Sequence, residues 1–387
     1  MTRKPVVALI EPRPAVTEAL RTLDVRCVAV RSEACEPDVH AETLHVRWDD
    51  PAEFERTVAA MAQVAPAVVL GFGETSVAVA AALAKRLGVA GPGADDVAIT
   101  TDKWLFRRRL SESGLPAVAQ RICDSAEALR AAVAELGTPL IVKPRSGVGS
   151  EGVQLLADPD EVDRLAHKLD YGQGHVVEEF LVGPEFSVES ISRDGAHEIL
   201  GVTRKSTSGP PGFVETGHVH PAPDGPYDEL RRAAVDVLDA IGMTTGLAHT
   251  EFILTDGGPR VIESHARPGG DRITDLFRLA TGRDMFVEVA AAHLGMPVQP
   301  SRQAARYAEI RFLSVPPGTV RAVTGLAEVA AFPWVHEISL PLAPGDPVRP
   351  VVSSATRPGF VVITGATPAD LAERFDRIGE LLLVDVV

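Results

Sequence analysis

The chain has 387 residues, of which 45% are hydrophobic and 24% are charged, a composition typical of folded globular proteins and unlike that of disordered chains. Its 38 Lys and Arg against 53 Asp and Glu give a net charge of −15, which argues against a broad nucleic-acid-binding surface. Apolar runs are too short to span a membrane, and the three cysteines form no CxxC pair. We therefore expect a cytoplasmic protein without structural disulfides, with about two to four domains.

The first 97 residues alternate short apolar runs with a helical pattern. Val6–Ile10, Val25–Val30 and Ala67–Gly71 are predicted to be buried strands. Apolar residues in Val77–Leu87 recur at helical spacing. Strands that alternate with helices predict a parallel α/β layer. The basic start of the chain reaches Glu11-Pro-Arg-Pro14 after one short apolar run, so we expect a first strand there and not a signal peptide.

The following segments mix helical and strand patterns. Helices are predicted at Leu105–Ser113, Ala126–Leu136, Asp158–Leu169, Leu230–Ile241 and Asp284–Leu294. Strands are predicted at Pro139–Pro144, Val153–Ala157, His175–Phe180, Glu185–Ile191, Ala248–Leu254 and Arg260–Glu263. Ser206–Gly225 is rich in Gly, Pro, Ser and His, and we expect an ordered, functional loop, because loops of about 20 residues are uncommon in compact proteins. After a linker at Met296–Pro300, β-rich runs with Pro and Gly turns precede a last helix at Pro368–Leu382.

A glycine-rich segment follows the predicted strand that contains Lys143. Gly147-Val-Gly149-Ser-Glu-Gly152 matches GxGxxG, but strand-like residues follow it, whereas a dinucleotide-binding turn requires a helix there. We expect a hairpin flap whose backbone N–H groups cover phosphates, with Lys143 as a fixed cation beside them. A plain turn between two strands is the alternative. The P-loop pattern GxxxxGK[ST] is absent from the sequence.

Two carboxylates flank a predicted hairpin around Asp256-Gly-Gly258. Antiparallel pairing of the two arms would place Glu251 and Glu263 near each other on one face. Facing carboxylates repel unless a cation lies between them, and oxygen ligands of this kind suit Mg²⁺. The alternative is a pair of solvent-facing charges.

Further polar side chains lie in three other segments. Arg267 follows the second arm and is suited to neutralise charge during phosphoryl transfer, while His265 fits a metal ligand, a hydrogen-bond donor or a structural residue. In the long loop, the Glu215 carboxylate is suited to hold an ammonium group and the His218 imidazole to stabilise an oxyanion; hydrogen bonding within the loop is the alternative. Glu74 follows a parallel strand, where ligands often bind, although a helix-start carboxylate is the simpler interpretation.

Taken in chain order, these motifs resemble the ATP-grasp superfamily over about residues 100–294. The strand and loop from Pro139 to Gly152 and the segment Glu178-Glu-Phe-Leu-Val-Gly-Pro-Glu185 are similar to those of D-alanine–D-alanine ligase. Glu215-x-x-His218, together with Arg267, resembles the bacilysin-type L-amino-acid ligases that make dipeptides. The resemblance implies an ATP-grasp fold, mixed α/β and α+β. Its expected parts are a pre-ATP-grasp α/β domain at 1–97, two ATP-grasp subdomains at 98–175 and 176–300, and a β-rich C-terminal lobe at 301–387.

The resemblance also implies a nucleotide site and a metal site. The residues that would bind the ATP phosphates are Lys103, Lys143 and the flap residues Ser146, Gly149, Ser150 and Gly152. Glu178, Phe180 and Leu181 would bind adenine, and Glu185 would bind the ribose. Glu251 and Glu263 would bind Mg²⁺, with Mn²⁺ as an alternative ion. The family usually has asparagine as the third ligand two residues after the second glutamate, and here that position is His265.

The implied activity is ATP-dependent joining of a carboxylate to an amine through an acyl phosphate, with release of ADP and phosphate. Glu215 and Glu74 would contact the substrates, and Arg267, His218 and Lys143 would be catalytic. We expect small-molecule substrates, no nucleic-acid or membrane partner, and a homodimer by analogy with the family. Two alternatives remain open at this point: a purine-pathway or biotin-carboxylase-like ligase, and a nucleotide-binding regulatory module without catalysis.

Overall fold

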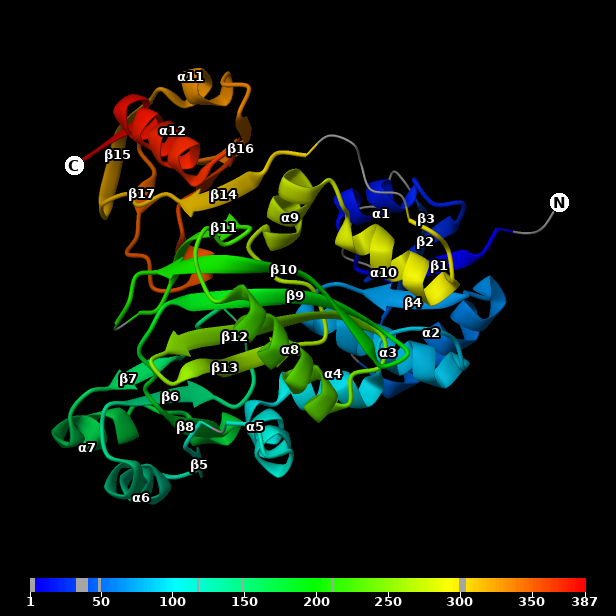
Figure 1. Cartoon of the computed structure of the whole chain (residues 1–387), viewed down its shortest axis with the longest axis horizontal. Helices are drawn as coiled ribbons and strands as arrows, with labels where there is room; N and C mark the ends of the chain where they lie inside the picture. The colour runs from blue at the N-terminus through cyan, green and yellow to red at the C-terminus, as the bar shows by residue number, and fades with distance from the viewer. Residues whose placement is uncertain are drawn as a thin grey trace.

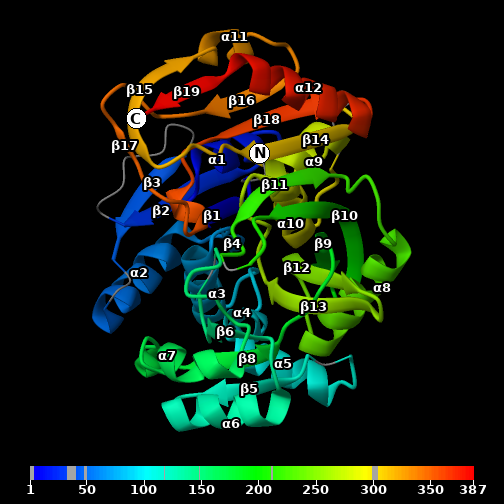
Figure 2. The ribbon, with the colours of Figure 1, turned by 90° about the vertical axis from the view of Figure 1, so that its left-hand side faces the viewer.

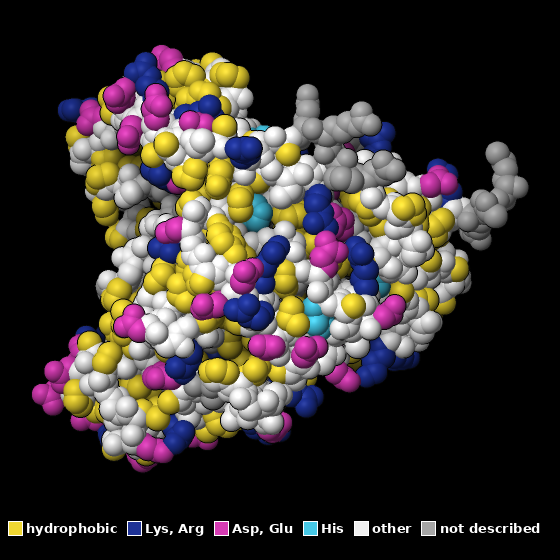
Figure 3. Space-filling view, in the orientation of Figure 1, with side chains coloured by type: hydrophobic (Ala, Val, Ile, Leu, Met, Phe, Trp, Pro, Cys, Tyr) yellow, Lys and Arg dark blue, Asp and Glu magenta, His cyan; other side chains and the backbone are white. Residues whose placement is uncertain are grey.

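The computed structural model describes residues 4–32, 41–47, 50–116, 118–147, 149–210, 212–298 and 304–387. Figure 1 shows the N-terminal layer on the right and the C-terminal region at the upper left. The end of the expected linker Met296–Pro300 lies outside the described residues. Within these residues, no helix combines the length and the apolar character that a membrane crossing needs. On the face shown in Figure 3, positive and negative side chains are interspersed.

The N-terminal layer is a four-stranded sheet in the order β3-β2-β1-β4, and every neighbouring pair is parallel. Its elements are β1 (Val6–Ile10), α1 (Pro14–Leu20), β2 (Arg26–Ser32), β3 (Glu42–Val46), α2 (Pro51–Val64), β4 (Val68–Gly71), α3 (Glu74–Leu87) and α4 (Ala94–Thr101). All five residues of β1 are buried, as expected for a strand covered on both faces. The predicted parallel α/β layer is confirmed, and the loops after β1 and β4 leave the same edge of the sheet.

A second sheet contains the lysine strand and the glycine-rich segment. Its order is β5-β8-β6-β7, and all three pairs are antiparallel. The region consists of α5 (Lys103–Glu112), β5 (Gln120–Cys123), α6 (Ala126–Leu136), β6 (Leu140–Pro144), β7 (Gln154–Leu156), η1 (Pro159–Glu161), α7 (Val162–Ala166), η2 (Tyr171–Gln173) and β8 (His175–Glu179). Leu140 pairs with Leu156, so the glycine-rich residues connect two antiparallel strands, as the hairpin prediction requires.

The largest sheet has eight strands in the order β13-β12-β9-β10-β11-β14-β18-β16. Its strands are β9 (Glu185–Arg193), β10 (Ala196–Thr207), β11 (Glu215–His220), β12 (Gly246–Thr255), β13 (Gly258–His265), β14 (Tyr307–Phe312), β16 (Val335–Ser339) and β18 (Phe360–Gly365). The helices that pack beside it include α8 (Tyr227–Ile241), α9 (Ile273–Thr281) and α10 (Met285–Leu294). One sheet therefore runs from the hairpin of the predicted metal site into the C-terminal region (Figure 2).

The C-terminal region adds a small three-stranded sheet in the order β17-β15-β19. Its elements are β15 (Gly318–Thr324), α11 (Leu326–Ala330), β17 (Pro347–Val348), η3 (Ser354–Thr356), α12 (Pro368–Leu381) and β19 (Leu383–Val386). The predicted last helix and β-rich character are confirmed.

The prediction of a loop over Ser206–Gly225 is wrong in its central part. Glu215–His220 is strand β11, which pairs with β10 on one side and β14 on the other. Its sequence Glu-Thr-Gly-His-Val-His lacks the apolar alternation of a strand, because its side chains line a polar site while its backbone bonds to both neighbours. Gly217 fits there because a Cβ atom at this position would lie 2.8 Å from the Ile310 carbonyl oxygen.

Candidate active site

A cavity of about 800 Å³ lies between the N-terminal layer, the flap hairpin and the large sheet. Every site residue predicted from the sequence lines it, apart from Gly152. Gly152 lies at the base of the flap with φ +72°, where a Cβ atom would lie 2.9 Å from Pro144 Cγ. Residues from distant parts of the sequence thus face one shared cavity, as the predicted site requires.

Lys103 joins the flap to the carboxylate pair. It is the first residue of α5, whose N-terminus is capped by the Asp102 carboxylate accepting from the backbone N–H of Trp104 and Leu105. Lys103 Nζ donates to the Gly147 carbonyl oxygen at 2.8 Å and lies 3.4 Å from Glu263 Oε2. This ammonium group therefore occupies the position between flap and carboxylates where a phosphate-binding lysine is needed.

Lys143 belongs to a buried ion triad. Its Nζ lies 2.7 Å from Glu178 Oε2, and the Arg107 guanidinium donates to the same carboxylate from Nε at 2.7 Å and Nη2 at 3.0 Å. Burial alone would raise the pKa of Glu178, but Arg107 and Lys143 outweigh it and hold that pKa at about 2. Sequence analysis missed Arg107, which stands in an Arg-Arg-Arg run that gives no sign of which member is buried.

The flap reaches the segment before β11. Gly147, Gly149 and Ser150 adopt positive φ angles of 124°, 69° and 58°, which explains the need for glycine in most of this turn. Ser150 Oγ donates to the Phe213 carbonyl oxygen at 3.2 Å, and the ring of Phe213 lies 6.0 Å from that of Phe180. The flap, the predicted adenine hinge and the strand with Glu215 are therefore in contact.

Glu251 and Glu263 are direct cross-strand partners in the β12–β13 hairpin, as predicted. Each has its own cation: Glu251 lies beside Lys205, and Glu263 lies beside Lys103. Burial would raise the pKa values of both carboxyl groups, but these lysines and the neighbouring histidines hold them well below the ordinary value. Two ionised, facing carboxylates fit Mg²⁺, which takes one or two carboxylates together with phosphate oxygens. The described residues contain no group of three or more metal-ligating side chains.

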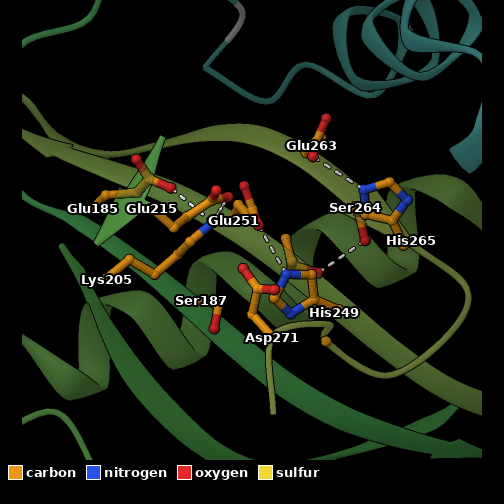
Figure 4. A network of polar contacts seen from close by, with 12 residues as sticks. Glu185, Ser187, Lys205, Glu215, His249, Glu251, Glu263, Ser264, His265 and Asp271 are labelled. Carbon is orange, nitrogen blue, oxygen red and sulfur yellow. Dashed lines mark hydrogen bonds and ion pairs between the residues drawn. The ribbon is translucent and has the colours of Figure 1, made fainter. Parts of the chain in front are cut away.

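Lys205 is the most connected cation of the site, and sequence analysis missed it. Its Nζ lies 2.8 Å from Glu185, 3.7 Å from Glu215 and 2.5 Å from Glu251, so it links the predicted ribose, substrate and metal residues (Figure 4). Burial would lower the pKa of Lys205, but the three carboxylates raise it well above its ordinary value. The sequence could have indicated this residue, because the apolar run Ile199–Val202 predicts a strand that continues to Lys205.

The two predicted substrate residues on β11 contact the C-terminal region. Glu215 Oε2 accepts from Ser354 Oγ at 2.8 Å. His218 is 2% exposed, and its Nε2 lies 3.7 Å from Asp271. Asp271 in turn accepts two hydrogen bonds from Arg357, at 2.8 and 2.6 Å. Ser354 and Arg357 were not predicted, because nothing in the sequence relates them to β11.

Glu74 starts a helix, as the simpler interpretation holds, and it also lines the cavity. It is the first residue of α3, and its carboxylate also accepts from Arg267 Nε at 2.5 Å and lies 3.3 Å from His265 Nδ1. Burial would raise the pKa of Glu74, but His265 and Arg267 lower it to about 2. The N-terminal layer thus contacts the arginine that follows the β12–β13 hairpin.

Comparison with known proteins agrees with this geometry. The ATP-grasp domain family matches residues 100–271, and the family described as L-amino acid ligase C-terminal domain 2 matches residues 311–387. Dapdiamide A synthase of Enterobacter agglomerans is 25% identical over 72% of this chain and 70% of that protein. Alanine–anticapsin ligase of Bacillus subtilis strain 168 is 28% identical over 55% of this chain and 50% of that protein.

The fold also matches a solved structure along its whole length. The crystal structure of an L-amino acid ligase from Bacillus licheniformis superimposes with a TM-score of 0.82, covering 100% of both chains at 22% identity. The predicted ATP-grasp fold is confirmed. The chain contains an ATP-grasp domain and a C-terminal domain of the L-amino acid ligase type, a combination that supports a ligase.

Proposed function

We propose that the enzyme joins the carboxylate of an amino acid, or of a related acid, to an amine through an acyl phosphate, with release of ADP and phosphate. The observation that supports this most is that Glu215, His218 and Arg267 line the same cavity as the two lysines and the facing carboxylates. One relative and one family match support amino acids as substrates, since the relative is named an alanine–anticapsin ligase and the C-terminal domain matches that of L-amino acid ligases.

The nucleotide would lie between the flap hairpin and the large sheet. Lys103 and Lys143 would face its phosphates, and the segment from Glu178 to Glu185 would contact adenine and ribose. Glu251 and Glu263 would hold Mg²⁺, or Mn²⁺ in its place, which supplies positive charge beside the phosphate oxygens. These assignments use the side chains that already carry paired charges around the cavity.

In the first step, a carboxylate oxygen of the acid would bond to the terminal phosphorus of ATP as the bond to ADP breaks. Arg267 would offset the charge that builds up on the transferred group. In the second step, the amine would attack the acyl carbon, His218 would donate to the resulting oxyanion, and phosphate would leave with the electron pair of its C–O bond. Glu215 would orient an ammonium group. Positioning and electrostatics would supply most of the rate enhancement.

The test is product formation by the purified full-length chain with ATP, Mg²⁺ and a panel of amino acids. We expect ADP and phosphate to appear only when both an acid and an amine are present, together with the condensed product. Release of AMP and pyrophosphate would contradict the acyl-phosphate route. ADP formation driven by bicarbonate without an amine would favour the biotin-carboxylase-like alternative.

A further inference from the structure

Each of the two facing carboxylates is backed by a histidine on its own strand. His249 precedes Glu251 by two residues and donates from Nε2 to Glu251 Oε1 at 2.9 Å. His265 follows Glu263 by two residues, and its Nε2 lies 3.1 Å from Glu263 Oε1. The two histidines are cross-strand partners, and their rings are stacked with centroids 6.2 Å apart. Figure 4 shows both histidines beside the two glutamates.

Each histidine is backed in turn by a second glutamate from another element. His249 Nδ1 is hydrogen-bonded to Glu189 Oε1, on β9, and both side chains are buried. His265 Nδ1 lies 3.3 Å from Glu74 Oε2, at the start of α3. Both nitrogens of each ring therefore face carboxylates, and we call the two Glu–His–Glu chains, Glu251–His249–Glu189 and Glu263–His265–Glu74, the paired braces.

Both braces end on the same turn, Arg267-Pro-Gly269. Glu74 binds the Arg267 guanidinium, and Glu189 Oε2 accepts from the Gly269 backbone N–H at 3.1 Å. A Cβ atom at residue 269 would lie 2.8 Å from His249 Nδ1 and 3.1 Å from Glu189 Oε1. The absence of a side chain at Gly269 therefore lets the turn approach His249 and Glu189 closely enough to donate its backbone N–H to Glu189.

We propose that the paired braces fix the Arg267-Pro-Gly269 turn relative to the two metal carboxylates, which makes Glu189 and His249 positioning residues for the reaction. The inference rests on the proposed function for the identity of the metal and of the transferred group. It also assigns His265 to a brace and not to the metal, because its Nε2 is hydrogen-bonded to Glu263 and its Nδ1 lies at ion-pair distance, 3.3 Å, from Glu74.

The physical reason for such a device is that Arg267 and the metal carboxylates must act on the same phosphoryl group. A displacement of about 1 Å in such a site can cost about 100-fold in rate. A proline and two glycines follow Arg267 in the sequence. The position of the turn therefore depends on the contacts that Arg267 makes with Glu74 and Gly269 makes with Glu189. Residues that orient metal ligands typically change metal affinity or activity about 10- to 100-fold when they are replaced.

The test is Glu189→Gln in the full-length chain, which keeps the side-chain volume but removes the negative charge and one acceptor. Binding of Mn²⁺ in the presence of ADP is measured by electron paramagnetic resonance, beside kcat and the KM values for acid and amine. We expect Mn²⁺ affinity and kcat to fall about 10-fold or more, while the KM for the amine stays unchanged. Gly269→Ala, which crowds the turn against His249 and Glu189 but removes no carboxylate, should lower kcat in the same way.

Glu288→Gln is the matched control, because Glu288 is a buried carboxylate, as Glu189 is. It is paired to Arg283 at 2.7 Å, and it does not line the cavity. It should lower the melting temperature without changing Mn²⁺ affinity. Wild-type Mn²⁺ affinity and kcat in both Glu189→Gln and Gly269→Ala would overturn the proposal. Coupling of Mn²⁺ to an imidazole nitrogen in pulsed spectra would overturn the assignment of His265. Mn²⁺ binding is read without product formation, so a wild-type chain that forms no product would refute the proposed function alone.

Discussion

At the scale of single residues, Lys205 shows how much of the site depends on one buried cation. Its ammonium group lies within 4 Å of Glu185, Glu215 and Glu251, so its removal leaves three acidic side chains without their shared partner. Removing one member of a buried ion pair typically destabilises a protein by about 3–5 kcal/mol.

We therefore expect Lys205→Met to lower the free energy of unfolding by about 3–5 kcal/mol and to abolish ligase activity. Urea denaturation and an ADP-release assay measure the two effects. Lys168→Met is the control, because Lys168 is exposed and such substitutions change stability by about 0.5 kcal/mol or less. Equal stability of the two variants would contradict the ion-pair account.

Glu178 should make stability depend on pH in the acid range. Its pKa of about 2 in the folded chain lies below the ordinary value of 4.5. Its contribution of about 3 kcal/mol is therefore present above about pH 4.5 and is lost as the pH falls toward 2. We expect Glu178→Gln to be clearly less stable than wild type at pH 7, with the difference shrinking at pH 3. Denaturation at both pH values tests this, and Glu135→Gln, at an exposed ion pair, should show no comparable change.

At this scale, the candidate site was largely predictable where a charged residue stands beside a recognisable strand or turn pattern. Glu251, Glu263 and Lys143 stand next to strand and turn signals, and the cavity brings them together. Arg107 and Lys205 could not be found in this way, because their importance comes from burial and from acidic partners that lie 10 to 71 residues away in the sequence.

At the scale of elements, the β6–β7 hairpin depends on residues that tolerate left-handed backbone. Gly152 has φ +72°, and a Cβ atom there would lie 2.9 Å from Pro144 Cγ. We expect Gly152→Ala to cost about 1–2 kcal/mol and to raise the KM for ATP without changing the KM for the amine. Thermal unfolding and steady-state kinetics measure both effects.

Gly379→Ala in α12 is the matched control for this glycine. Gly379 has no heavy atom within 4 Å of an added Cβ atom and lies inside a helix, so the substitution should stabilise the chain by about 0.5–1 kcal/mol. A Gly152→Ala variant that is as stable as wild type would show that the flap does not need this conformation.

Elements whose hydrophobic residues recur at regular spacing were predicted. Strand β11, which is held by hydrogen bonds to neighbouring strands, was not. The amphipathic pattern of Leu230–Ile241 predicted α8 correctly, since its buried residues face one side. Strand β11 was missed because its side chains serve the cavity while its backbone hydrogen bonds come from β10 and β14. One of its two partners, β14, lies far away in the sequence, so local composition does not reveal the pairing.

At the scale of the whole molecule, the C-terminal region contributes directly to the cavity. The Arg357 guanidinium lies 3.5 Å from the centre of the Phe312 ring and makes a two-pronged contact with Asp271. We expect Arg357→Ala to raise the KM for the amine about 10-fold, since hydrogen bonds to charged groups contribute about 1.5–3 kcal/mol. Arg357→Lys should not restore it, because an ammonium group cannot make the planar contact.

Arg321→Ala is the control in the same region, because Arg321 pairs with Asp385 at an exposed position. Arg321→Ala should leave the KM values for the acid and for the amine unchanged. An unchanged KM in Arg357→Ala would mean that the C-terminal region acts only as a support for the sheet.

The eight-stranded sheet also limits how such enzymes can be recombined. Strand β11 lies between β10 and β14, and the register of β11 with β14 runs from Gly217 to His220. A chimera that imports a foreign C-terminal half would place an unfamiliar strand against Glu215 and His218, the residues proposed to contact the substrates. Grafting experiments should therefore transplant β11 and its C-terminal neighbours as one block, because substrate choice and scaffold are inherited together.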